Sequence, residues 1–238
     1  MNDQPRASRA RADLARWVGV DPSQDIPRPP PLSRARIVRT ALRLVDEKGL
    51  AALTIRALAT ELNVSPMALY NHVRDKEELV DLMVDLMLGE VDTTPTEGDW
   101  LAQLRALVCG YHRTLAAHHH LARVYSGRVR IGPHGLRIIE RALELLLEGG
   151  LPPAEASDAF FALFTYTAGF EQMGHIAPQH PSAPGEDAEY YPPLPPEQIP
   201  AITTVGRHLD GVHRPGRFEY GLELLLAGLR SRAVSTGR

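Results

Sequence analysis

The stretch LTIRALATELNVSPMALYNHV, residues 53–73, decides the fold of this chain. Apolar residues recur at helical spacing on both sides of Asn63-Val64, and each half opens on a good N-cap residue, Thr54 or Ser65. Pro66 occupies the first position of the second half, where its missing N–H is harmless. The pattern predicts two short helices, over residues 54–62 and 66–72, joined by a tight turn. These are the dimensions of a helix-turn-helix.

The flanking residues predict a longer helix on each side of this pair. Upstream, Ser33 caps a run of apolar residues at 3.6-residue spacing that ends at Gly49. Downstream, Asp75 and Glu78 have the spacing of a capping box and open a helix over residues 76–91. The apolar residues that can pack the short pair onto the upstream helix are Leu58, Leu62, Val64, Leu69 and Val73.

This packing leaves one face of the second short helix pointing outward. Its residues are Pro66, Met67, Tyr70 and Asn71. Side chains near the start of such a helix can reach base edges in the major groove of duplex DNA. Arg56, on the first short helix, can reach a guanine edge by a bidentate contact. The sequence therefore predicts a surface suited to DNA.

The rest of the chain predicts helices over residues 100–117, 133–148, 153–175, 199–211 and 215–232. No segment alternates convincingly with period two, so we expect an all-α fold. It comprises an Arg- and Pro-rich flexible arm (1–32), a three-helix helix-turn-helix DNA-binding domain (33–80) and a C-terminal helical domain (81–238). A polar, Pro-rich loop over residues 177–200 is the one long irregular insertion.

The composition narrows the class of protein. An apolar fraction of 44% in 238 residues suffices for buried cores, and the single cysteine, Cys109, excludes an internal disulfide or a multi-cysteine zinc site. We expect a cytoplasmic protein, because no signal peptide or membrane span is evident. The net charge is −3, yet residues 1–80 hold 13 Lys and Arg against 10 Asp and Glu, so the basic part is N-terminal.

Residues 41–83 resemble the DNA-binding domain of TetR-type repressors. The resemblance rests on Gly49, the Leu53-Thr54 entry to the first short helix, Leu69-Tyr70-x-His72-Val73 and Lys76. It implies a DNA-binding transcriptional regulator, a repressor that a small-molecule effector releases from its operator. By the same resemblance, the residues that approach bases are Arg56, Pro66, Met67, Ala68, Tyr70 and Asn71, and those that hold phosphates are Thr54, His72 and Lys76. The apolar Pro66-Met67-Ala68 can contact thymine methyl groups but cannot hydrogen-bond bases.

Residues 150–175 are apolar almost all round their helix, as expected for a helix buried between others or at a subunit interface. They resemble the eighth helix of the tetracycline-repressor branch, including Thr167-x-Gly169. This implies an effector cavity that includes Leu107, Tyr111 and Thr165, to which the apolar neighbours Phe161 and Phe164 are added. We therefore expect a largely apolar effector.

The same part of the chain predicts a homodimer. The interface is expected on helices 153–175 and 215–232, the latter through Leu222, Leu225, Leu226 and Leu229. Because a two-fold dimer reads two half-sites, the operator should be pseudo-palindromic.

No cofactor or metal is assigned. Glu171 and His175 lie four residues apart and can share a metal, but a plain surface pair is the simpler interpretation. His118, His119 and His120 can also bind a metal, but imidazoles near the end of a helix more simply complement its negative dipole end. An enzyme would require a phosphate loop, a nucleophile elbow or specific metal-ligand spacing, none of which the sequence contains. A constitutive DNA-binding protein without an effector remains an alternative.

Overall fold

The computed structural model describes residues 31–125, 131–176, 195–208 and 214–236. The described residues from Arg34 onward belong to one compact unit. Within these ranges every regular element is a helix and no strand is present, which confirms the predicted all-α class. The predicted arm lies almost entirely outside the described residues, as does the predicted loop up to residue 194.

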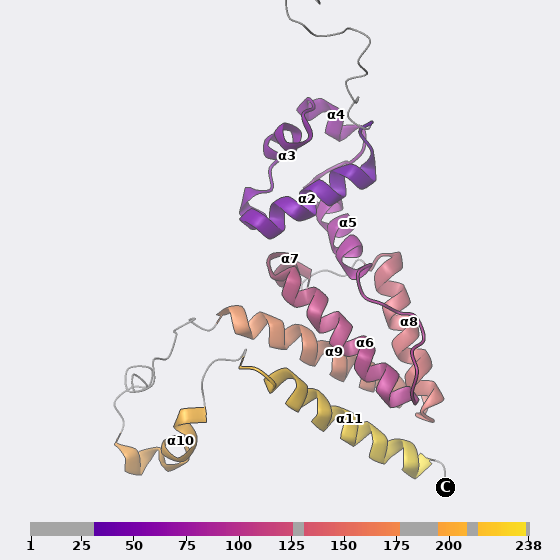
Figure 1. The fold of residues 1–238 in the computed structure, drawn as a ribbon, viewed down its shortest axis with the longest axis vertical. Coiled ribbons are helices and arrows are strands. Elements are labelled where there is room, and N and C mark those ends of the chain that lie inside the picture. The colour runs from indigo at the N-terminus through magenta and orange to yellow at the C-terminus, as the bar shows by residue number, and fades with distance from the viewer. Residues whose placement is uncertain (1–30, 126–130, 177–194, 209–213, 237–238) are drawn as a thin grey trace, which may run out of the picture. The chain divides into compact units, whose positions relative to one another are not determined.

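The first three α-helices fold as the sequence predicts (Figure 1). They are α2 (Arg34–Lys48), α3 (Ile55–Leu62) and α4 (Pro66–Tyr70), and a short 3₁₀ turn, η1 (Leu50–Ala52), precedes α3. Thr54 and Ser65 cap α3 and α4, because their hydroxyl oxygens accept hydrogen bonds from the backbone N–H of Ala57 (3.0 Å) and Ala68 (3.3 Å). Asn63 ends α3 in the left-handed conformation (φ 54°), which makes the tight turn between the two helices.

A small apolar core holds α4 in place. Leu58, Leu62, Leu69 and Val73 are all at most 4% exposed. Helix α3 packs on α2, whose buried face includes Ile37 and Ala41, and α4 packs on α3. Val64, predicted to share this core, is only half-buried. Helix α4 therefore depends on its packing against this core, since five residues are too few to form a stable helix alone.

Helix α5 (Lys76–Leu88) continues from this three-helix part and packs on α2 and on later helices. Its N-cap is Asp75, whose Oδ1 accepts from the Glu78 N–H at 2.7 Å. The capping box differs from the predicted form in one respect. The Glu78 carboxylate accepts from the backbone N–H of Arg74 (2.7 Å) and not from that of the N-cap residue.

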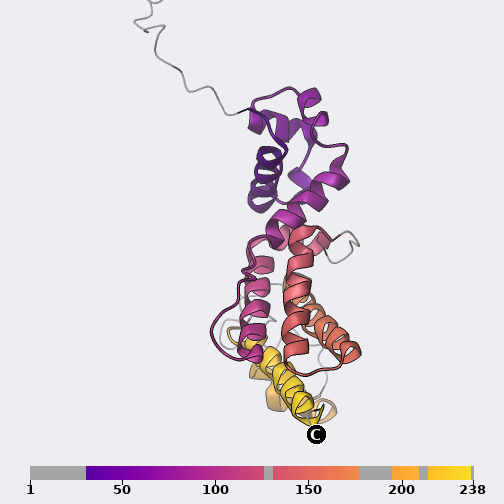
Figure 2. The same ribbon diagram turned by 90° about the vertical axis from the view of Figure 1, so that its right-hand side faces the viewer.

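The remaining helices are α6 (Trp100–Ala117), α7 (His119–Tyr125), α8 (Pro133–Glu148), α9 (Pro153–Ile176), α10 (Pro200–Val205) and α11 (Arg217–Thr236). Helices α6, α8 and α9 pack on one another, and α11 packs on α9 and α6, as both views show (Figures 1 and 2). Helices α9 and α11 approach closely at Gly221, where a Cβ atom would collide with the Tyr166 hydroxyl. That hydroxyl donates to the Phe218 carbonyl at 3.0 Å.

Three local predictions were wrong. The sequence pattern missed α7, which follows α6 after only the C-cap residue His118. The helix predicted over residues 199–211 is shorter, because α10 gives way at Gly206 to a 3₁₀ turn, η4 (Gly206–His208). Leu222 and Leu226, predicted at a dimer interface, are at most 3% exposed within a single chain and belong to its core. Among the described helices, none is long and apolar enough to cross a membrane.

Candidate nucleic-acid interface and effector cleft

The predicted reading face of α4 is exposed. Met67 and Tyr70 are 73% and 51% exposed, and Pro66 and Asn71 are exposed as well. Ala68 is half-buried beside Leu69, which is fully buried. Large apolar and aromatic side chains with this exposure on a helix of five residues are consistent with a contact surface, since Met67 has no packing role inside the chain.

The basic side chains around this face fall into two groups. Arg34, Arg43 and Arg74 form ion pairs with glutamates on the same three-helix part and the start of α5. In the described part of the chain, Arg56 on α3 and Lys76 at the start of α5 are exposed and form no such ion pair. Their charges are therefore available to an anionic partner. Thr54, at the start of α3, is also exposed, although its hydroxyl already accepts the capping bond from Ala57.

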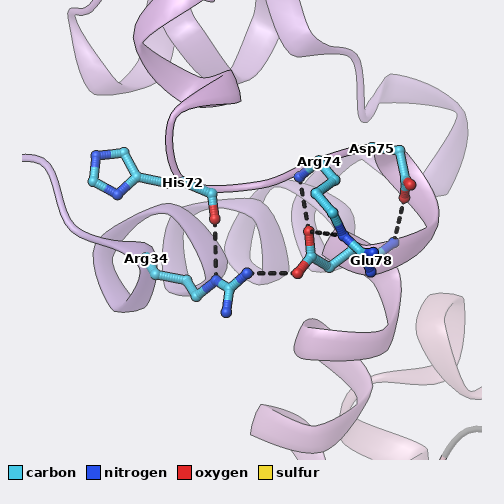
Figure 3. Close-up of polar contacts among 5 residues, drawn as sticks. All are labelled: Arg34, His72, Arg74, Asp75 and Glu78. Carbon is cyan, nitrogen blue, oxygen red and sulfur yellow. Dashed lines mark hydrogen bonds and ion pairs between the residues drawn. The ribbon is translucent and has the colours of Figure 1, made fainter.

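A polar cluster fixes the segment between α4 and α5 (Figure 3). The Arg34 guanidinium donates to the His72 carbonyl (3.0 Å) and to Glu78 Oε1 (2.5 Å), while Glu78 Oε2 accepts from Arg74. The hydrogen bond from the Arg74 backbone, followed by the charge of Arg34, outweighs partial desolvation and lowers the pKa of Glu78. A charged Glu78 thus holds the backbone that carries His72 and Lys76 against the start of α2.

A cleft of about 380 Å³ lies beside α6 and α8. The segment after α5 forms part of its lining, and the lining residues are Glu90, Asp92, Thr93, Thr94, Thr96, Gln103, Ala106, Leu107, Gly110, Arg113, Thr114, Ala117, Arg141 and Leu145. Arg141, on α8, is only 13% exposed. Its guanidinium donates to Gln103 Oε1 (2.6 Å) and pairs with Glu144 (3.0 Å). The lining of the cleft therefore combines apolar residues such as Leu107 and Leu145 with charged ones such as Glu90, Arg113 and Arg141.

The five residues predicted for the effector cavity do not meet at one place in the single chain. Leu107 lines the cleft. Tyr111 is buried, and its ring lies 4.9 Å from that of Phe164 between α6 and α9. Phe161 is 61% exposed and Thr165 is also exposed, both on α9.

The charged lining of the cleft was not predicted. Glu90, Arg113 and Arg141 come from three separate segments, so no spacing in the sequence relates them. One signal was present in the sequence, because Arg141 interrupts the apolar pattern of its helix between Ile138 and Leu145.

The histidine and acid pairs considered for metal binding are arranged differently from the sequence interpretation. Glu171 is 3% exposed and its Oε1 lies 2.7 Å from Nε2 of His112, a pair that the sequence spacing did not suggest. The side chain of His175 lies outside the described residues. His118 contacts the carboxylates of Asp46 and Glu90, so it does not act together with His119 and His120 as the sequence interpretation considered. Among the described residues, no group of three or more His, Cys, Asp or Glu side chains is arranged to hold a metal ion.

Comparison with known proteins gives the same assignment for both parts of the chain. The family "Bacterial regulatory proteins, tetR family" matches residues 37–83, and "Tetracyclin repressor-like, C-terminal domain" matches residues 93–233. The tetracycline repressor protein class C of Escherichia coli is 28% identical over 215 residues, which cover 86% of this chain and 94% of that protein. The class A repressor from transposon 1721 of Escherichia coli is 30% identical over 207 residues, 83% of this chain and 90% of the relative.

Solved structures agree with these relatives. Apo ActR from Streptomyces coelicolor superposes with a TM-score of 0.74 at 34% identity, covering 86% of this chain and 98% of ActR. The complex of ActR with actinorhodin gives a TM-score of 0.73 at 35% identity, covering 84% and 96%. The fold of this chain is thus shared along nearly the whole length of these proteins. The chain belongs to the TetR family and is a ligand-responsive transcriptional repressor of that family.

Proposed function

We propose that this repressor binds a pseudo-palindromic operator as a cytoplasmic homodimer, with α4 of each subunit in the major groove, and that a small molecule in the cleft releases it. The observation that carries the proposal is the reading face of α4, where exposed Met67 and Tyr70 flank the buried anchor Leu69. The role is regulatory and involves no chemical reaction.

Each residue of the interface has a role that follows from its chemistry. Arg56, Tyr70 and Asn71 carry hydrogen-bonding groups toward base edges, while Pro66, Met67 and Ala68 offer apolar surface to thymine methyl groups. Lys76, His72 and Thr54 donate to phosphates and set the position of the helix. The cluster around Glu78 supports His72 and Lys76, since it holds the His72 carbonyl and the start of α5.

The effector site includes the cleft. Its volume lies within the range of drug-sized ligand pockets. Leu107 and Leu145 provide apolar contact, whereas Arg113, Arg141 and Gln103 suit polar or anionic groups on the ligand. We therefore propose an amphipathic effector in place of the largely apolar one that the sequence suggested. Tyr111 and Phe164 pack against each other between α6 and α9, next to the helix that lines the cleft. The exposed Phe161 and Thr165 belong to the effector site only where a second subunit covers α9.

The first experiment selects DNA duplexes from a random library with the purified protein. We expect enrichment of a two-fold symmetric site, to which affinity falls steeply with salt because phosphate contacts release counterions. Candidate effectors are then tested for their ability to release the protein from that duplex. They include tetracycline and actinorhodin, the compounds that appear in the names of the similar proteins. Leu107→Trp fills the cleft and should abolish release while DNA affinity is kept; Leu147→Trp, at an exposed position on α8, is the matched control. Enrichment of no sequence would contradict the proposal, and so would a compound that releases wild type and Leu107→Trp equally.

The dimer interface is proposed on the exposed side of α9 and α11. Phe161 and Met173 on α9, and Tyr220 and Leu224 on α11, are 60–69% exposed in the single chain. Such a concentration of large apolar side chains on two adjacent helices is unusual for a free surface and fits a second copy of the same pair.

Introducing charge at this face should separate the subunits. We expect Leu224→Lys combined with Phe161→Glu to give a monomer in sedimentation at micromolar concentration and to weaken operator binding by at least about tenfold, because each subunit then binds one half-site. Val205→Lys, which changes an exposed apolar residue on α10, is the control. A double variant that sediments like wild type would place the interface elsewhere.

A further inference from the structure

His118 joins three parts of the molecule at one imidazole ring. It is the C-cap residue of α6, where its backbone N–H bonds to the Thr114 carbonyl at 3.1 Å. Its Nδ1 lies 2.9 and 3.0 Å from the two carboxylate oxygens of Asp46, on α2. Its Nε2 lies 3.1 Å from Glu90, just past the end of α5. The ring is 11% exposed.

The contacts of His118 with Asp46 and Glu90 form a bridge that requires a protonated imidazole ring. A neutral imidazole has only one N–H, so it cannot donate to carboxylates from both nitrogens, whereas the imidazolium donates from both. Burial alone would lower the pKa of His118, but the hydrogen bonds and charges of Asp46 and Glu90 outweigh it and the pKa is raised. The bridge is therefore intact below that pKa and is lost as the pH rises through it.

Other charged groups near the bridge come from α7 and α9. His119 feels Asp46 on α2, His120, Arg123 and Glu171, and burial followed by the repulsion of His120 lowers its pKa. The two carboxylates that contact His118 directly thus remain Asp46 and Glu90. Burial and the repulsion of its neighbours thus favour neutral His119.

Glu90 has a second role, because it also lines the cleft. A hydrogen-bond donor or cation in the cleft that engages Glu90 competes directly with Nε2 of His118. On the other side, Asp46 belongs to α2, the helix on which α3 packs, and α3 in turn packs against α4. The chain of contacts from the cleft to the three-helix DNA-binding part (α2, α3 and α4) therefore runs through Glu90, His118 and Asp46.

We propose that protonated His118 is the link that holds α2 in the DNA-binding arrangement, and that the cleft acts on DNA affinity by breaking its contact with Glu90. This inference rests on the proposed function in one point, that the chain without effector is the DNA-binding form. It assigns to His118 a positioning role and not a contact with DNA.

The test measures the ring pKa of His118 by NMR in the full-length protein, free and bound to the selected duplex. Linkage is reciprocal, so if the bridge favours DNA binding, DNA must raise this pKa. We expect a rise of about 0.5 to 1 pH unit, which corresponds, for each subunit of the dimer, to operator affinity about threefold to tenfold higher with His118 protonated. Wild-type affinity should accordingly fall as the pH is raised through this pKa, and His118→Asn should remove that part of the pH profile.

Two further variants keep the test decisive. Glu90→Gln alters an exposed side chain, so folding is not at risk, and should lower the pKa of His118 and reduce the effect of DNA on it. His134→Asn is the control, because His134 pairs with Asp85 (3.0 Å) between α8 and α5 without touching α2, and should leave the pH profile unchanged. An unchanged His118 pKa on DNA binding would overturn this inference alone. Failure of wild type to bind any selected duplex would overturn it together with the proposed function.

Discussion

Leu69→Ala should cost about 2 to 5 kcal/mol of folding free energy, the range for removing a buried leucine and leaving a cavity. Leu69 is fully buried and is the only residue of α4 with that exposure. The helix has five residues and little intrinsic stability, so it depends on this anchor. We expect operator binding to be lost together with the ordered conformation of α4, as measured by urea unfolding and by amide exchange of residues 66–70.

Met67→Ala is the matched control, two residues away on the same helix. Met67 is 73% exposed, so its truncation should change the free energy of unfolding by no more than about 0.5 kcal/mol. It should instead weaken operator binding, because it removes apolar contact with the DNA. Equal stability of Leu69→Ala and wild type would show that α4 is held by something other than this core.

Arg56→Ala and Tyr70→Ala should each weaken binding to the selected operator by about 1 to 3 kcal/mol, which is about 5-fold to 150-fold. Both side chains are exposed beside the reading face, and neither supports the core. Their loss should therefore leave thermal stability unchanged and relax the sequence preference at the contacted positions. Binding to selected and scrambled duplexes at one salt concentration gives both quantities.

Lys76→Ala provides the contrast in the same assay. Since Lys76 is proposed to meet a phosphate, its loss should weaken binding to all duplexes alike and reduce the steepness of the salt dependence by about one unit. A Lys76 variant that lost affinity for the selected operator only would make Lys76 a base-reading residue. Tyr70→Ala with unchanged preference among sequences would remove Tyr70 from the reading face.

Local sequence signals determined the N-terminal part of the fold. Thr54, Ser65 and Asp75 cap the helices that they were expected to cap, and Asn63 makes the turn between α3 and α4. These signals act within four residues along the chain, through one side-chain oxygen and one backbone N–H, so they can be read without knowledge of the tertiary fold. The same holds for Leu58 and Leu62, whose helical spacing within α3 places them on one buried face.

Signals that depend on a partner helix were ambiguous in the sequence. The leucines of α11 repeat at three and four, which indicates an apolar face but not whether it meets its own chain or another. Packing on α9 decides this, since Leu222 and Leu226 are buried there while Leu224 stays exposed. Likewise, α7 begins one residue after α6, and no breaker such as Gly or Pro marks the change of direction at His118.

What the sequence by itself determined is the all-α class, the helix-turn-helix and the outward face of its second helix, because each follows from short-range capping and helical periodicity. Only the tertiary structure decided the rest. The cleft joins Glu90, Arg113 and Arg141, and the bridge joins Asp46, His118 and Glu90, from segments between 23 and 72 residues apart. Such long-range groupings depend on how whole helices pack, and no local preference of these residues encodes that packing.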